Sequence, residues 1–96
     1  MEIRVLRGAE VRNLLPMTAC VDLMHRTMIA VSERRVVLPL RSVMVMPGEL
    51  GMMGNMPGYI AEPECFGVKL VSLIPRNKPP HYSSHLGLVQ IGRAHV

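Results

Sequence analysis

The stretch CFGVKLVSLIP, residues 65–75, is the most apolar part of the chain, and it contains a single charged residue, Lys69. Its density of Val, Leu and Ile favours a strand that is buried on both faces, and it is far too short to span a bilayer as a helix. An ammonium group is costly to remove from water. Lys69 therefore either reaches solvent along its alkyl chain at a sheet edge, or has an anionic partner beside it.

A second cation, Arg41, lies in another strand-like apolar run, LPLRSV at residues 38–43. For either cation alone, a position at a sheet edge is as good an explanation as an anionic partner. Two such cations on separate strands of one small sheet favour a shared anion. The planar fork of arginine matches a carboxylate at two points. His85, with Ser83 and Ser84 at a strand entrance, is a further candidate for the same site, although a lone loop histidine is more often an ordinary surface residue.

The order of patterns along the chain predicts an α+β fold, with amphipathic helices first and then an antiparallel or mixed sheet. Apolar residues recur at helical spacing between Met17 and Glu33, and β-forming residues then alternate with Pro-Gly turns. The expected elements are a short strand at 3–6, helical turns at 8–15, a helix at 17–33, strands at 36–46, 50–56, 65–74 and 86–91, turns at Pro47-Gly48 and Pro57-Gly58, and a polar, Pro-rich connection at 75–85.

Composition narrows the class of protein. The 96 residues make one small domain at most, or a piece of a larger one, and a hydrophobic content of 49% argues against disorder. Cys20 and Cys65 have no CxxC spacing and no signal peptide precedes them, so we expect a cytoplasmic protein in which Cys65 is a core residue. The 11 Lys and Arg residues are scattered rather than striped, which argues against a nucleic-acid partner.

Motifs for cofactors and metals are missing from the sequence. There is no GxGxxG, no Walker loop and no cluster of metal-ligand residues. We therefore predict no cofactor-binding residues and no metal-binding residues in this chain. The apolar runs are also too short for a membrane partner.

Five segments follow one another along the chain: LLPMTACVDLMHRTMIAVS, VLPLRSVMVMP, GMMGNMPGYI, FGVKLVSLIP and SSHLGLV. In this order they resemble the start of the ornithine cyclodeaminase and mu-crystallin family. Members of that family show an LLPM-type helix start, an arginine in a strand, an MP-aromatic turn, a GVK strand and a Ser-His strand entrance. The resemblance covers about residues 5–89. No single motif is specific to the family, but five motifs in the same order and at the right spacing are.

The resemblance implies a function in amino-acid metabolism. The family consists of oxidoreductases and cyclodeaminases that use NAD or NADP, including ornithine cyclodeaminases, alanine dehydrogenases and reductases of cyclic ketimines such as pyrroline carboxylate. By this resemblance Arg41 and Lys69 anchor the substrate carboxylate, with His85 as a further substrate-binding residue. A lysine shielded from water gives up its proton readily, so we also expect a catalytic role for Lys69, transferring a proton near the imine nitrogen, second to anchoring.

The family's N-terminal segment belongs to a substrate-binding and dimerisation domain, and a Rossmann domain follows it. We therefore expect residues 1–90 to be the N-terminal part of the first domain, and the full-length protein to be a homodimer. Residues 91–96 depart from the family pattern and are expected to be a tail of a truncated chain, which would be inactive alone because the cofactor domain is missing. Gly54 stands where cyclodeaminases carry an acidic residue, which favours a smaller or cyclic imino acid over ornithine.

Three functions remain open at this point. The first is the N-terminal part of an NAD(P)-dependent imino-acid reductase or of an ornithine cyclodeaminase-like deaminase. The alternative is a non-enzymatic dimerisation or binding module that uses the same sheet. The third, and least favoured, is a small basic nucleic-acid binder, which predicts a steep salt dependence of DNA affinity.

Overall fold

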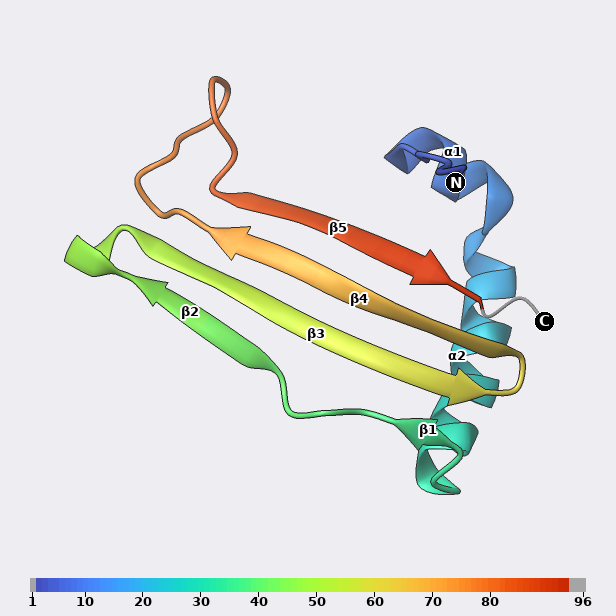
Figure 1. The fold of residues 1–96 in the computed structure, drawn as a ribbon. Helices are drawn as coiled ribbons and strands as arrows, with labels where there is room; N and C mark the ends of the chain where they lie inside the picture. The colour runs from blue at the N-terminus through green and yellow to red at the C-terminus, as the bar shows by residue number, and fades with distance from the viewer. Residues whose placement is uncertain (1, 94–96) are drawn as a thin grey trace. The chain divides into compact units, whose positions relative to one another are not determined.

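The computed structural model describes residues 2–93 and contains two helices followed by five strands in one sheet (Figure 1). The chain divides into two compact units between Arg34 and Arg35, with the helices in the first unit and the strands in the second. All the strand pairs described in the sheet are antiparallel. The chain therefore has the expected α+β class, with an antiparallel rather than a mixed sheet.

The first unit contains α1 (Gly8–Leu14) and α2 (Met17–Ser32). The Glu10 carboxylate accepts a hydrogen bond of 3.1 Å from the Arg7 backbone N–H, which satisfies a donor just before the helix. Residues 3–6, predicted as a strand, form no strand, because none of the described strands pairs with them. No single helix of residues 2–93 is long and apolar enough to cross a membrane. The pair α1 and α2, with a bend of 77° between them, meets the same criterion by length and composition only.

The methionines of α2 do not lie in a core. The exposed fractions of Met17, Met24 and Met28 are 75%, 47% and 63%, and Ala30 is the buried hydrophobic residue of the described chain. The helical spacing of these methionines predicts a helix face packed against a core, and the structure corrects this prediction. The least exposed side of the helix carries Cys20, Leu23, Thr27 and Ala30, which recur at intervals of three and four residues.

The second unit is an open sheet with the order β1-β3-β4-β5, in which β2 also pairs with β3. The strands are β1 (Val36–Val37), β2 (Ser42–Met46), β3 (Gly51–Ala61), β4 (Glu64–Leu73) and β5 (His85–Gly92). β1 and β2 lie end to end along the same edge of β3, since Val36 pairs with Ile60 and Ser42 with Asn55. β4 lies between β3 and β5 (Figure 1).

β3 continues through Pro57-Gly58, where the sequence predicted a turn. Pro57 pairs with Val68 of β4, but neither β1 nor β2 pairs with residues 56–58 on the other side. A proline is tolerated in a strand at such an edge position, where its missing N–H is not needed. The turn between β3 and β4 falls instead at Glu62-Pro63.

The remaining predicted turns and connections are close to the structure. Pro47-Gly48 begins a short 3-10 segment, Pro47–Glu49, in which Gly48 has a φ of 66°. The expected strand at 36–46 is interrupted at residues 38–41, which separate β1 from β2. Residues 74–84 connect β4 to β5, and the peptide bonds before Pro63 and Pro80 are cis. β5 includes Ile91 and Gly92 of the expected tail, whereas residues 94–96 lie outside the described residues.

Many apolar side chains of the strands are exposed. The exposed fraction is 73% for Val45 and 61% for Val89 on one face, and 58% for Leu88 on the other. β4, the central strand, is the most shielded, because most of its residues are half-buried. Lys69 is nevertheless exposed, so the expectation that residues 65–75 form a strand buried on both faces, with Lys69 inside, is wrong.

Candidate carboxylate-binding site

Arg41 and Lys69 line one hollow on the sheet, with a volume of about 420 Å³. Apolar groups make up the rest of its wall. The lining consists of Leu38, Pro39, Arg41, Met56, Pro57, Gly58, Gly67, Val68, Lys69 and Val89. We call this hollow the Arg41–Lys69 hollow.

The strand register explains why the two cations share it. Lys69 of β4 pairs with Met56 of β3, and Val43 of β2 pairs with Gly54, two residues before Met56. Residues directly opposite one another in a sheet share a face, and so do residues two apart along a strand. Arg41 lies two residues before Val43, so the same alternation places it on the face of Lys69.

Two irregularities of the sheet open the hollow. Leu38 and Pro39 come from the connection between β1 and β2, beside the residues of β3 that neither strand pairs with. Gly58 and Gly67 pair with one another in the floor of the hollow. A Cβ at Gly67 would lie 2.7 Å from the Gln90 backbone oxygen, so the close approach of β5 requires glycine there.

The hollow is positively charged by composition. Its lining contains two cations and no carboxylate. Among residues 2–93, no hydrogen bond or ion pair engages the guanidinium of Arg41 or the ammonium of Lys69. Arginine and lysine side chains supply eight N–H donors between them and no acceptor. The arrangement suits a small anion whose uncharged part rests against the apolar wall.

His85 lies on the same face as Lys69 but does not line the hollow. It pairs with Leu73, four residues along β4 from Lys69, which is about 13 Å at the spacing of a strand. Its Nδ1 lies 3.0 Å from the Ser84 Oγ, and its backbone carbonyl accepts a hydrogen bond from the Ser83 hydroxyl. The structure therefore brings Arg41 and Lys69 together and leaves His85, Ser83 and Ser84 as a separate cluster at the start of β5.

Other candidate groups lie apart as well. Cys65 is half-buried rather than in a core, and it does not line the hollow. Among residues 2–93 there is no group of three or more His, Cys, Asp or Glu side chains that could hold a metal ion. No sequence pattern predicts Met56, Pro57 and Val89 as site residues, because they become wall residues only through the register of three strands.

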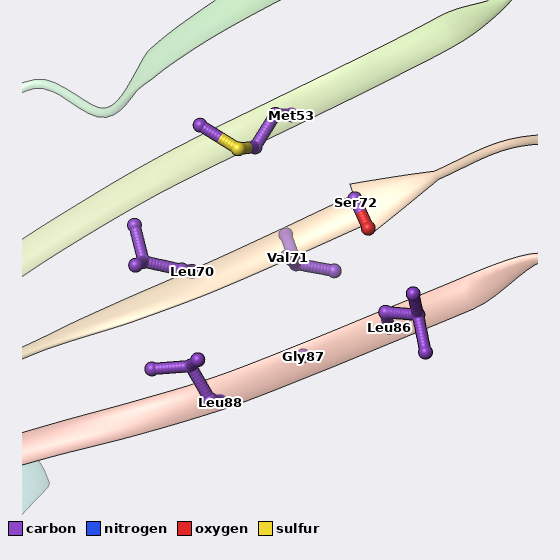
Figure 2. Close-up of a pocket in the computed structure, with 7 residues that line it drawn as sticks. All are labelled: Met53, Leu70, Val71, Ser72, Leu86, Gly87 and Leu88. Atoms are coloured by element: carbon purple, nitrogen blue, oxygen red, sulfur yellow. The ribbon is translucent and has the colours of Figure 1, made fainter.

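A second hollow, of about 270 Å³, involves the adjacent residues of β4 and β5 and is lined by Met53, Leu70, Val71, Ser72, Leu86, Gly87 and Leu88 (Figure 2). Figure 2 shows these residues on three neighbouring strands, β3, β4 and β5. Met53, Ser72 and Leu86 are register partners and share the face opposite to Lys69. This apolar groove has no charged residue and a single hydroxyl, so it offers no group for acid–base chemistry.

The fold and the site together define a class: a small α+β chain whose open antiparallel sheet carries a two-cation hollow with apolar walls. Comparison of the chain with protein-family models, with curated proteins and with solved structures gave no match.

Proposed function

We propose that the chain provides the carboxylate-binding part of an enzyme that acts on small imino or amino acids. The enzyme would be a reductase of the ketimine or pyrroline-carboxylate type, or an ornithine cyclodeaminase-like deaminase. The observation that carries the proposal is that Arg41 and Lys69 come from separate segments to line one hollow whose lining holds no carboxylate. The proposal also draws on the order of the five sequence motifs.

In this proposal the two cations have different roles. The Arg41 guanidinium binds both oxygens of the substrate carboxylate through its fork, and the Lys69 ammonium adds a point charge beside it. Leu38, Met56 and Val89 would then contact the hydrocarbon part of the substrate. Lys69 also supplies a proton near the imine nitrogen, as a second role.

The described residues do not fit a nicotinamide dinucleotide. Such a cofactor needs a glycine-rich turn between a strand and a helix whose N-terminus faces the pyrophosphate, and no helix follows a strand in residues 2–93 apart from the short 3-10 segment. We therefore assign substrate binding and the proton transfer by Lys69, but no cofactor binding, to these residues. NAD or NADP would be bound by a part of a longer cytoplasmic, homodimeric protein outside these residues.

A binding experiment on the chain tests the proposal. The probe is pyrrole-2-carboxylate, a planar imino-acid analogue, with the neutral pyrrole-2-carboxamide as its matched control, and binding is followed by NMR shift changes. We expect the carboxylate to bind and the amide not to bind. Arg41→Ala and Lys69→Ala should each weaken binding about 5-fold, as expected for an exposed ion pair worth about 1 kcal/mol.

Lys78→Ala is the control variant, because it removes the same charge from the β4–β5 connection and leaves the hollow intact. It should bind the carboxylate as the unaltered chain does. Equal binding of the carboxamide, or an equal loss in Lys78→Ala, would mean that the hollow does not recognise a carboxylate.

A second candidate function is a dimerisation or binding module without catalysis. The exposure of apolar side chains around the apolar groove favours it, since Met53, Leu86 and Leu88 are 40%, 60% and 58% exposed. Contiguous exposed apolar surface commonly marks a site of association. This module would self-associate without binding the carboxylate probe.

A further inference from the structure

The connection between β4 and β5 presents four exposed residues, Pro79-Pro80-His81-Tyr82, away from the strands. Figure 1 shows this loop, in orange, extending beyond the ends of the two strands it joins. Its base is fixed, because the Ile74 N–H donates to the Ser84 carbonyl at 2.8 Å and the Asn77 side chain donates to the Ser83 carbonyl at 3.1 Å. The loop is therefore held at both ends while its tip is free to contact a partner.

The tip carries a tyrosine that is exposed to 70%, the largest exposed aromatic surface among the described residues. Its backbone N–H donates to the Lys78 carbonyl at 3.2 Å, which closes a turn around the two prolines. The Arg41–Lys69 hollow lies elsewhere on the sheet, and none of its lining residues belongs to this loop. An exposed ring beside exposed prolines is a surface suited to contact rather than to packing within the chain.

The spacing of these residues fits one mode of peptide recognition. In the structure these residues form a turn closed by the Tyr82 N–H. Extended as a polyproline II helix, which has three residues per turn, Pro79 and Tyr82 would fall on the same side with Pro80 next to them. Proline-recognition domains hold extended segments of this kind in grooves lined with aromatic side chains. The sequence has no pair of prolines three residues apart, which disfavours the PxxP type of ligand.

We propose that Pro79–Tyr82 is a docking motif for a domain of the WW class, whose aromatic groove takes the two prolines and whose neighbouring pocket takes the tyrosine ring. Arg76 and Lys78 lie just before the motif in the chain and favour an acidic rim on that domain. The docked segment is extended, so binding opens the turn between Tyr82 and Lys78. This inference is independent of the carboxylate-binding function and uses none of its residues.

The test measures binding of the full chain to an isolated WW domain by fluorescence polarisation, with an SH3 domain as the specificity control. We expect saturable binding to the WW domain and none to the SH3 domain. Tyr82→Ala and Pro80→Ala should each weaken binding at least about 10-fold, as expected for anchor residues at the centre of an interface. His81→Ala changes the position that faces neither pocket and should bind as the unaltered chain does.

Two further measurements keep the test decisive. Circular dichroism spectra of the variants should match that of the unaltered chain, because all three positions are exposed, and a synthetic peptide of residues 74–85 should compete for the WW domain. Binding that survives Tyr82→Ala, or that falls equally in His81→Ala, overturns the proposal. Binding that disappears at raised salt and needs only Arg76 and Lys78 also overturns it, because the contact would then be a nonspecific charge attraction.

Discussion

The exposure of Arg41 and Lys69 decides how strongly they can hold an anion. Exposed ion pairs contribute about 0.2–1 kcal/mol, because water screens them. Removing one partner of a desolvated pair costs about 2–5 kcal/mol, which is roughly 30- to 3000-fold in an equilibrium or rate constant. The same two residues are therefore weak anchors in an open hollow, and become strong ones only when another surface covers it.

Arg41→Lys distinguishes an arginine fork from a point charge. The variant keeps the positive charge but loses the two-point contact with a carboxylate. We expect it to recover less than half of the affinity that Arg41→Ala loses for pyrrole-2-carboxylate, measured by NMR titration. Arg76→Lys, in the β4–β5 connection, is the matched control and should bind like the unaltered chain. Full affinity in Arg41→Lys would show that the charge alone suffices.

Lys69→Ala separates anchoring from proton transfer in a longer protein that joins residues 1–90 to a nicotinamide domain. If the ammonium does both, kcat and kcat/KM for a cyclic imino acid should fall together, with kcat/KM lower by roughly 30- to 3000-fold. If it only anchors, KM should rise while kcat is kept. Cys65→Ala, a half-buried change outside the hollow, should alter stability but leave kcat unchanged.

At the scale of elements, the sequence predicted the two helices and the strands that alternating β-formers mark, but not their lengths or pairing. Pro57-Gly58 has the composition of a turn, and lies inside β3 because the neighbouring edge is unpaired at that point. The sequence predicted that Arg41 and Lys69 serve one site, but alternation places them on one face only once the strand register is known. Their shared wall could not be predicted either, because Met56 and Val89 reach it only through the register, and the exposure of Lys69 depends on what covers each face.

Gly67→Ala and Gly87→Ala test the close approach of β4 and β5. A Cβ at Gly67 would lie 2.7 Å from the Gln90 backbone oxygen, which cannot move without displacing the strand. A Cβ at Gly87 would lie 3.4 Å from the Leu70 oxygen, at the edge of ordinary contact. We expect Gly67→Ala to lower the free energy of unfolding in urea by about 1–3 kcal/mol, and Gly87→Ala to change it by under about 1 kcal/mol. Equal effects would mean that β5 does not approach β4 as closely as this.

At the scale of the whole molecule, exposed apolar side chains on the strands predict self-association. Leu88 lies at the middle of β5, is 58% exposed and lines the apolar groove, so a second copy covering that groove would bury it. Burying a leucine contributes about 1.5–3 kcal/mol, and a two-fold dimer buries the position twice. Leu88→Lys should therefore weaken the dimer at least about 100-fold, measured by sedimentation equilibrium.

The matched control for this prediction is Leu40→Lys. Leu40 is 96% exposed, lies in the connection between β1 and β2, and lines neither hollow, so a lysine there adds the same charge without touching the groove. The unaltered chain and Leu40→Lys should show the same concentration-dependent association, while Leu88→Lys sediments as a monomer. Because charge alone raises solubility, an equal shift in both variants would assign the effect to net charge. A monodisperse, cooperatively unfolding monomer for the unaltered chain would show that the sheet is stable with its apolar groove open to water.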